Sequence, residues 1–428
     1  MKKHLLAIAG VTALTLSIAA CSAGGGGADG GEIVITCESC PKTAADGDTF
    51  AQYRMQLWKA FNEEYKGKYR VEPKPYTAAN EADSAQHFLR AAATNTLPDL
   101  FVTQANVIVQ VGESGGLMDF TDALNTDTDW KDSFQANSFN SLTNPEGQIL
   151  GIPEQVDAIG IYYNTALFDA AGIKEFPTTW DDFFADAEKL KASGVIPLAM
   201  DGDWVTQLMW ANLIGTQPGG ADFLESGIKD GGFADNKEVV SATEYLKSLH
   251  TAGLVNEDAF TGDYNRAAAP FLEGQAAMIA NGPWMSPNIA DAGITAGYAP
   301  APEDGVIVLA GNAGWASGAK DADKQEAVTA FMKFMTSDDQ EFKKVITTGS
   351  YWPTNFEPTA DQVAQLEPLG YGMFQAAQSA KYTYPHAKFA TPPAFTTAWI
   401  NNWPAYVQDA MSTTEFLDSL SEAVENNR

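Results

Sequence analysis

Cysteine, histidine and basic residues are scarce in this sequence of 428 residues. It has 3 cysteines and 4 histidines, and 26 lysines and arginines stand against 55 aspartates and glutamates, for a formal net charge of -29. The deficit of positive charge argues against binding to nucleic acid or to anionic lipid, because like charges repel. It also disfavours a strongly phosphorylated ligand. Most of the acidity is expected to serve solubility.

Beyond the first 20 residues, no apolar run approaches the length of a membrane span. Lys2 and Lys3 precede an apolar run over residues 5–20, which is the layout of a signal peptide. Ile18-Ala19-Ala20-Cys21 resembles the lipobox of bacterial lipoproteins, in which the cysteine is acylated and becomes the new N-terminus. We therefore expect a signal peptide over 1–20, a lipid on Cys21 and a soluble remainder on the extracellular face of the membrane. An ordinary secretory signal with a chance cysteine is the alternative.

The segment after Cys21 is rich in glycine. Residues 22–31 contain six glycines and almost no side chain that could be buried, so residues 21–31 are expected to form a flexible tether. The two other cysteines, Cys37 and Cys40, are two residues apart in an exported chain, and a disulfide is the default for such a pair. A thioredoxin-like redox motif is the alternative, but Pro41 follows the second cysteine and the next helical pattern begins only near Phe50.

Motifs for catalysis, cofactors and metals are missing or incomplete. There is no H-E-x-x-H, P-loop or dinucleotide fingerprint. Gly112–Gly116 fits the G-x-S-x-G pattern of a hydrolase nucleophile, but no clear helix follows it, and neither His250 nor His386 has a supporting motif. Residues 125–129 imitate the start of a calcium loop, but Trp130 stands where the loop needs glycine. We expect no cofactor and no metal.

Strand-like and helix-like patterns alternate from residue 32 onward, which indicates an α/β fold with mainly parallel sheets. The expected strands include 32–36, 69–76 and 195–200, and the expected helices include 50–66, one beginning near 178, 236–250 and 323–335. A body of about 400 residues is too long for one core, so at least two lobes are expected.

Two blocks of sequence carry a resemblance to a known family. The first comprises Gly151-Ile152-Pro153, Asp157, Ile161-Tyr162-Tyr163-Asn164, Leu167-Phe168, Ala171-Gly172-Ile173 and Pro177-Thr178-Thr179-Trp180. The second runs from Phe271 to Trp284 and is similar to an F-x-x-G-x-A-A-M-x-x-x-G-P-W pattern. Weaker matches are 97–100, 115–120 and the helix from Asp323. Together they resemble family 1 extracellular solute-binding proteins, which include maltose-binding protein.

The resemblance implies two α/β lobes that close on a ligand like a hinge. Lobe one would comprise 32–155 plus 313–367, and lobe two 156–312 plus 368–428. The implied function is capture of a carbohydrate, an oligosaccharide by the number of aromatic loops, and its delivery to the membrane permease of an ABC-type importer. The protein would be a monomer. It would bind its ligand without catalysing a reaction. The particular sugar does not follow from the sequence.

A sugar needs aromatic platforms for its C–H faces and carboxylates or amides for its hydroxyls. Asp203 and Trp204 follow the predicted strand 195–200, and Trp284 follows a strand at 276–280. Asp157 matches an acidic ligand contact of the family. Further candidates are Gln104, Asn106, Glu38, Ser39, Trp315, Trp352 and Trp399. The maltose-binding pattern has an aromatic residue at the position of Thr103, so this chain departs there from the pattern for the aromatic platform of lobe one. For any single tryptophan, a place in the core is the alternative.

Three other functions stay open. Asp157 and Asp203 could serve as the acid and base of a glycosidase, which needs paired carboxylates across a cleft. A cationic ligand such as a polyamine would exploit the negative charge, and its binding would weaken in salt. Glycerol phosphate is bound by some members of the family.

Overall fold

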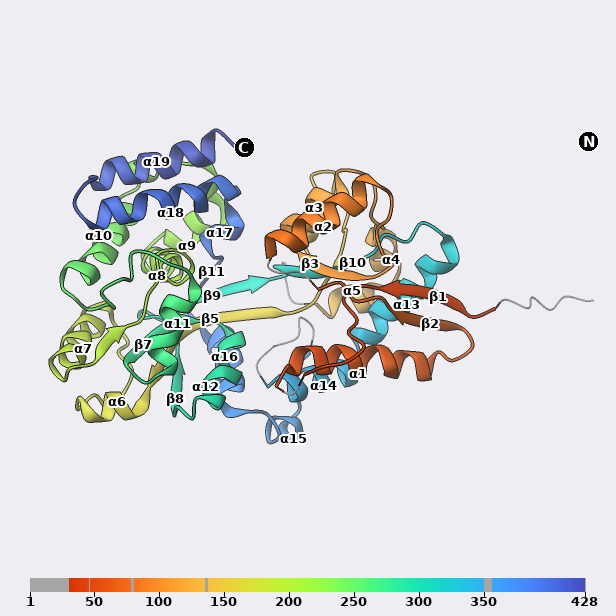
Figure 1. Cartoon of the computed structure of the whole chain (residues 1–428), viewed down its shortest axis with the longest axis horizontal. Coiled ribbons are helices and arrows are strands. Elements are labelled where there is room, and N and C mark those ends of the chain that lie inside the picture. Colours follow the sequence, from red (N-terminus) through yellow and green to blue (C-terminus); the bar gives the residue numbers. More distant parts are fainter. Residues whose placement is uncertain (1–30, 46, 78–80, 135–137, 350–355, 428) are drawn as a thin grey trace, which may run out of the picture.

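The computed structural model describes residues 31–427, apart from 46, 78–80, 135–137 and 350–355. Within these residues the chain forms two lobes joined by long strands (Figure 1). Cys21 with its tether, and Trp352, lie outside the described residues. In the part of the chain that is described, no helix combines the length and apolarity that crossing a membrane requires.

Lobe 1 holds two small sheets. Strands β1 and β2 pair in parallel, and β10 pairs antiparallel between β3 and β4. Its strands are β1 (Ile33–Cys37), β2 (Tyr69–Pro73), β3 (Phe101–Gln104), β4 (Ile152–Pro153) and β10 (Ala313–Ala316). Its helices are α1 (Thr49–Glu64), α2 (Glu81–Ala93), α3 (Ala105–Gly112), α4 (Thr121–Thr126), α5 (Thr128–Asp132), η1 (Asn140–Leu142), α13 (Ala322–Met335) and α14 (Asp338–Thr348).

Lobe 2 is built on one larger sheet with the order β11-β9-β5-β7-β6, and β8 also pairs with β5. Its strands are β5 (Val156–Asn164), β6 (Ile196–Leu198), β7 (Ala276–Asn281), β8 (Ala296–Ala299), β9 (Gly305–Ala310) and β11 (Tyr382–Tyr384). Its helices are α6 (Thr165–Ala170), α7 (Trp180–Ala192), α8 (Trp204–Gly215), α9 (Gly220–Asp222), η2 (Phe223–Gly227), η3 (Ile228–Asp230), η4 (Phe233–Asp235), α10 (Lys237–Thr251), α11 (Tyr264–Leu272), η5 (Pro283–Met285), α12 (Ser286–Asp291), α16 (Pro368–Ser379), α17 (Ala387–Ala390), α18 (Pro393–Val407) and α19 (Thr413–Glu425).

The lobes are connected by a narrow waist. The chain enters lobe 2 between β4 and β5 and leaves it between β9 and β10, and these segments lie side by side because Val156 pairs with Ala310. A third connection runs from α14 through α15 (Ala360–Val363) to α16. Glu154 of the first connection is fixed to lobe 1, since the Arg54 guanidinium donates to both its carboxylate oxygens at 2.7 and 2.9 Å. Such a waist suits a hinge.

The expectation of mainly parallel sheets is wrong. Parallel pairing occurs between β1 and β2, β6 and β7, and β9 and β11. The long strand β5 is antiparallel to β7, β8 and β9, and β10 is antiparallel to both its neighbours. For β5 and β9 the reason is that these strands carry the chain into lobe 2 and back out of it, so they run in opposite directions.

Local sequence signals place several elements within a few residues of their expected positions. Helix α7 starts after Thr179, whose hydroxyl accepts a hydrogen bond from the Asp182 amide, and Gly194 follows the helix at φ +86°. Side-chain capping and a left-handed glycine are ordinary start and stop devices. Asn236 caps α10 in the same way.

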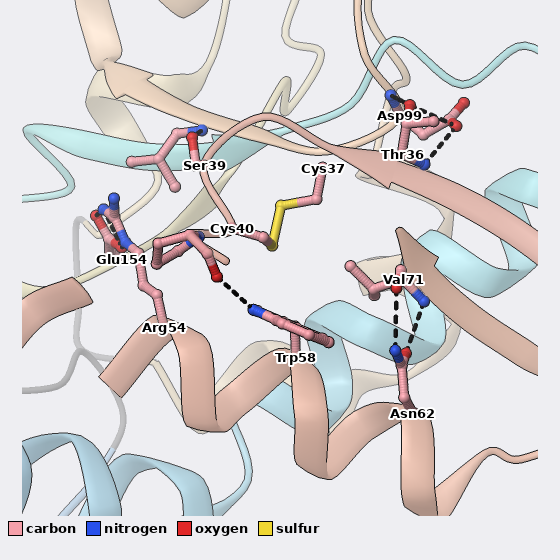
Figure 2. Close-up of a disulfide and its surroundings, with 12 residues drawn as sticks. Thr36, Cys37, Ser39, Cys40, Arg54, Trp58, Asn62, Val71, Asp99 and Glu154 are labelled. Atoms are coloured by element: carbon pink, nitrogen blue, oxygen red, sulfur yellow. Dashed lines mark hydrogen bonds and ion pairs between the residues drawn. A yellow bond between two sulfur atoms is a disulfide. The ribbon is translucent and has the colours of Figure 1, made fainter. Parts of the chain in front are cut away.

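Each lobe has its own hydrophobic core. The core of lobe 2 is built from buried residues within 158–309 and 373–424. The cores of lobe 1 are built from buried residues within 35–152 and 315–335. The loop after β1 is closed by a disulfide between Cys37 and Cys40, which are 0 % and 1 % exposed. Trp58 Nε1 donates to the Pro41 carbonyl at 2.9 Å and anchors this loop on α1 (Figure 2).

Candidate functional site

A cavity of about 550 Å³ lies where the waist strands enter lobe 2. Gln104, at the end of β3 in lobe 1, lies on its wall. The other lining residues are Gln155, Asp157, Asp203, Trp204, Asp263, Tyr264, Trp284, Leu309, Asn312, Lys388 and Phe389. The position agrees with the general tendency of ligand sites in α/β proteins to lie at the junction of structural units.

Strand alternation decides which waist residues face this cavity. Gln155 and Asp157 line it, whereas Val156 and Ala158 line a smaller pocket of about 200 Å³. On β9, in the same way, Leu309 lines the larger cavity and Val308 lines the smaller pocket. Because successive side chains of an extended chain point to opposite faces, Gln155 and Asp157 face the larger cavity and Val156 and Ala158 face the smaller pocket.

Asp157 is a buried carboxylate surrounded by amides. It is 1 % exposed, accepts from Gln155 Nε2 at 2.8 Å and is 3.5 Å from Asn312 Nδ2. Burial raises the pKa of Asp157 to about 6, although the two amide hydrogen bonds oppose the rise. The remaining oxygens Gln155 Oε1 and Asn312 Oδ1 are buried without a hydrogen-bond partner. This corner therefore offers acceptors and needs a ligand that brings donors.

The start of α8 forms a second polar corner. Asp201 Oδ1 accepts from the backbone amides of Asp203 and Val205, both at 3.0 Å, and thereby holds the loop before the helix. Asp203 accepts from Gln207 Nε2 at 2.8 Å. Burial raises the pKa of Asp203, while the positive charge of Lys388 opposes this. Asp203 thus presents a partly desolvated carboxylate to the cavity.

Aromatic side chains form the apolar wall. The Trp204 and Trp284 rings lie 6.1 Å apart between centroids and are tilted by 54°, and Phe389 meets Trp204 edge-on at 5.9 Å. The Lys388 ammonium lies 5.3 Å from the centre of the Trp204 ring. Two inclined indoles beside carboxylates and amides give the combination of apolar faces and polar edges that carbohydrate binding requires.

His386 supports Trp204 from behind. Its ring stacks on the indole at 4.3 Å with an interplanar angle of 14°, and it is fully buried. Burial lowers the pKa of His386 to about 3, so the imidazole is neutral at physiological pH. Nδ1 accepts from the Lys388 amide at 2.9 Å. The orientation of the Trp204 ring is therefore fixed by packing before any ligand arrives.

The structure brings some expected site residues together and separates others. Asp157, Asp203, Trp204, Trp284 and Gln104 line the same cavity. Glu38 and Ser39 line a different pocket within lobe 1. Asn106 is exposed, does not line this cavity, and its side chain accepts from the Val107 amide.

The expectation for Trp315 and Trp399 needs correction. Trp315 is 1 % exposed because it lies on β10, the central strand of its sheet, where it packs on Phe331 with ring centroids 5.4 Å apart. Trp399 is 0 % exposed because α18 buries it against Trp403, with ring centroids 5.1 Å apart. Both indoles belong to the hydrophobic cores and neither lines the cavity.

Several cavity residues were not found from the sequence. Gln155 had a usable signal, since it lies in extended chain just before β5, two residues before Asp157, and so points to the same side. Asn312, Tyr264, Lys388 and Phe389 come from segments far apart in the sequence and carry no local motif. Only the fold places them around one space.

Gly282 provides a test of the Trp284 platform. A Cβ at this position would lie 2.4 Å from the Trp284 ring, although the backbone, at φ -104°, tolerates any residue. We expect Gly282→Ala to displace the indole and to weaken ligand binding about tenfold or more, given the usual cost of overpacking. Gly372→Ala is the matched control, because nothing lies within 4 Å of its added methyl. Calorimetric titration of the ligand into both variants checks this prediction. If Gly282→Ala and Gly372→Ala bound the ligand with equal affinity, the role of Trp284 would be contradicted.

Residues 56–369 match the family model described as bacterial extracellular solute-binding protein, and the chain belongs to this family. The two-lobed α/β fold expected from the sequence is confirmed by solved structures. A chitin oligosaccharide binding protein superposes with a TM-score of 0.75 at 21% identity, covering 92% of this chain and 99% of the other. A Streptococcus pneumoniae solute-binding protein in complex with the blood group A-trisaccharide gives 0.71 at 20% identity, covering 92% and 100%.

Sequence relatives include proteins named for their sugars. The diacetylchitobiose binding protein DasA of Streptomyces coelicolor is 26% identical over 363 residues, which are 80% of each chain. The maltodextrin-binding protein MdxE of Bacillus subtilis is 25% identical over 350 residues, 78% of this chain and 77% of the other. These relatives are binding proteins rather than enzymes.

Proposed function

We propose that this protein captures an oligosaccharide in the cavity beside the waist and delivers it to the permease of an ABC-type importer. The observation that carries the proposal is the pair of inclined indoles, Trp204 and Trp284, next to buried acceptors without partners on Gln155 and Asn312. A sugar ring offers apolar C–H faces to the indoles and hydroxyl donors to the acceptors. A ligand that lacks those hydroxyls would leave the acceptors unpaired and would bind more weakly.

The names of the relatives support a sugar ligand and suggest where to start. The two sequence relatives and the chitin oligosaccharide binding protein named above carry diacetylchitobiose, maltodextrin and chitin oligosaccharide in their names. We therefore expect a neutral oligosaccharide, with chito- and malto-oligosaccharides as the first to test.

Glycerol phosphate is the second candidate ligand. An sn-glycerol-3-phosphate-binding periplasmic protein of Rhizobium meliloti is 26% identical over 209 residues, 46% of this chain. Of the described residues that line the cavity, Lys388 is the one cation, and it stands against Asp157, Asp203 and Asp263. A phosphate would meet mainly repulsion there, so the carbohydrate has the stronger support.

A thermal-shift screen tests the ligand class. The panel holds chito-, malto- and xylo-oligosaccharides, glycerol 3-phosphate and a polyamine, each at low and high salt. A ligand at a hundredfold excess over its Kd adds about 2.7 kcal/mol to stability, so the true ligand raises Tm visibly. A response to glycerol phosphate or polyamine alone would overturn the proposal. If cleavage products accumulated from any oligosaccharide, the proposed binding function would give way to a glycosidase that uses Asp157 and Asp203.

We also infer that the protein works as a monomer tethered to the extracellular face of the membrane through a lipid on Cys21. The lipobox-like Ile18-Ala19-Ala20-Cys21 supports this. Expressed in a bacterium that processes lipoproteins, the full chain should sediment with membranes and carry the mass of a lipidated N-terminus. The Cys21→Ala variant should not carry that mass.

A further inference from the structure

A cluster of buried charged side chains lies in lobe 1 beside the waist, outside the cavity of the proposed function. Glu341 and Lys344 of α14 are each 1 % exposed, and Glu154 of the first connection is 4 % exposed. Arg54 of α1 completes the cluster. None of the four lines the cavity, and charged side chains are rarely buried to this degree. The contacts already described therefore do not account for the cluster.

Three elements of lobe 1 hold the polar groups of Glu154. Arg54 Nη2 of α1 donates to its carboxylate oxygens at 2.7 and 2.9 Å, next to the disulfide loop (Figure 2). The Lys344 ammonium of α14 donates to its backbone carbonyl at 2.6 Å. Its backbone amide donates to the Ala313 carbonyl of β10 at 3.2 Å. Residue 154 is thus a fixed point of lobe 1 from which the chain continues into lobe 2.

The fixed carbonyl controls the next residue through the planar peptide bond. The Glu154 carbonyl and the amide and Cα of Gln155 belong to one rigid plane. The contact with Lys344 therefore fixes the N–Cα bond of Gln155, from which its side chain is directed. That side chain lines the cavity, donates to Asp157 and keeps Oε1 buried without a hydrogen-bond partner. An acceptor of the proposed ligand is thus aimed by a lysine that lies outside the cavity.

Asn312, the other cavity amide whose oxygen has no hydrogen-bond partner, is mounted in a similar way. Its backbone carbonyl accepts from the Ala105 amide, at the start of α3 in lobe 1, at 2.9 Å. Its side-chain Nδ2 lies 3.5 Å from Asp157, which pairs with Leu309 in the sheet of lobe 2. The two amides beside Asp157 are therefore both carried by backbone that lobe 1 holds.

The pair of Lys344 and Glu341 adds little to stability by itself. Lys344 Nζ is 2.8 Å from Glu341 Oε2, but both groups leave water on folding. Burial raises the pKa of Glu341 to about 7, the charge of Lys344 opposes that rise, and the charge of Glu154 adds to it. The attraction thus does not offset the cost of burying the carboxylate, as is common for buried pairs. Removing both charges should leave the fold intact, which allows a positional role to be separated from a structural one.

We propose that Lys344 is a positioning residue for ligand recognition and that Glu341 is its counterion. It holds the peptide plane between Glu154 and Gln155 and thereby keeps the Gln155 amide turned towards the ligand. Without the ammonium this plane can turn, and the amide then adopts orientations in which Oε1 no longer meets a ligand hydroxyl. The inference rests on the proposed function, because it names the residue that aims one of the acceptors of that site.

A double-mutant cycle tests the coupling of Lys344 to Gln155. Wild type, Lys344→Met, Gln155→Ala and the variant with both changes are titrated calorimetrically with the chito- or malto-oligosaccharide that raises Tm most in the thermal screen. Lys344→Met should bind about tenfold more weakly, the upper value for one lost hydrogen bond. In the Gln155→Ala background the same change should cost less than about twofold, because the amide that it aims is absent.

Lys324→Met is the matched control. Lys324 of α13 also joins a helix of lobe 1 to a buried carboxylate, at 2.8 Å from Asp99 Oδ2, and it does not line the cavity. This variant should keep wild-type affinity. Melting temperatures verify that each variant is folded. Glu341→Gln combined with Lys344→Met replaces the single variant if the carboxylate left without its partner destabilises lobe 1.

Hydrogen exchange gives a readout that needs no sugar. The backbone amides of residues 152–157 should exchange faster in Lys344→Met than in wild type, while Lys324→Met leaves them unchanged. An equal loss of affinity in both backgrounds, no loss at all, or unchanged exchange would overturn the positioning role while sugar binding by the wild type stands. Failure of the wild type to bind any sugar would instead remove the proposed function, and hydrogen exchange would still decide whether Lys344 fixes the peptide plane.

Discussion

Replacing Asp157 by asparagine is expected to weaken oligosaccharide binding by about 10- to 100-fold, the usual value of a hydrogen bond to a charged group. The carboxylate is fixed by Gln155 at 2.8 Å within a cluster of acceptors. Asparagine keeps the shape of the side chain but removes the charge that draws hydroxyl donors. Asp263→Asn is the matched control, because Asp263 is an exposed acid on the same cavity.

The same change should stabilise the ligand-free protein at neutral pH. Burial raises the pKa of Asp157 from 3.8 to about 6, so the folded state holds its proton more tightly than the unfolded state does. The folded protein therefore loses stability as the pH rises from about 4 to 6, and the full cost persists above pH 6. Asparagine removes that cost, which is up to about 3 kcal/mol at 1.36 kcal/mol per pKa unit.

Two measurements check these effects. Thermal or urea unfolding at pH 8 should show a more stable Asp157→Asn variant, with the difference fading towards pH 4. Wild-type affinity should fall about tenfold between pH 7 and pH 5, because the carboxyl becomes protonated below pH 6, whereas the variant should show much less of this fall. Asp201, whose pKa burial also raises to about 6, stays in both proteins and cancels in the comparison. Equal affinity of the wild type at both pH values would contradict a charged role for Asp157.

Truncating the indoles should have an effect of similar size. Trp204→Ala and Trp284→Ala are each expected to cost at least about 2 kcal/mol of binding free energy, or roughly 30-fold in Kd, as for aromatic residues at the centre of an interface. Trp204→Phe should recover part of the loss, because the smaller ring can still stack on His386. Calorimetry with the screened sugar gives the affinities, and quenching of indole fluorescence gives an independent readout.

Trp180→Ala is the control for removing an indole outside the cavity. Trp180 is half-buried, packs edge-on against Phe183 at 5.4 Å and donates to Thr216 Oγ1 at 2.9 Å. Its loss should lower the melting temperature but leave the affinity of the folded protein unchanged. If all three tryptophan variants lost affinity equally, the effect would come from general destabilisation and not from stacking.

The sequence predicted those features that depend on neighbouring residues. The start of α7 at Thr179 and of α10 after Asn236 could be read because a cap acts on amides two or three residues away. The family resemblance added the two-lobed fold and directed attention to Asp157, Trp204 and Trp284. Tryptophan identity alone was insufficient: Trp315 and Trp399 were further candidates for a platform, but β10 and α18 place them in the hydrophobic cores.

By itself, then, the sequence determined local structure, the family and the scarcity of positive charge, since these depend on neighbouring residues, motifs and composition. Tertiary structure alone decided the direction of the waist strands and the grouping of Gln155, Asn312 and Lys388 around one space. It also placed the ring of His386 against Trp204. The physical reason is that strand pairing, burial and ring stacking join residues more than 100 positions apart in these cases, and no local sequence pattern records which distant residues become partners.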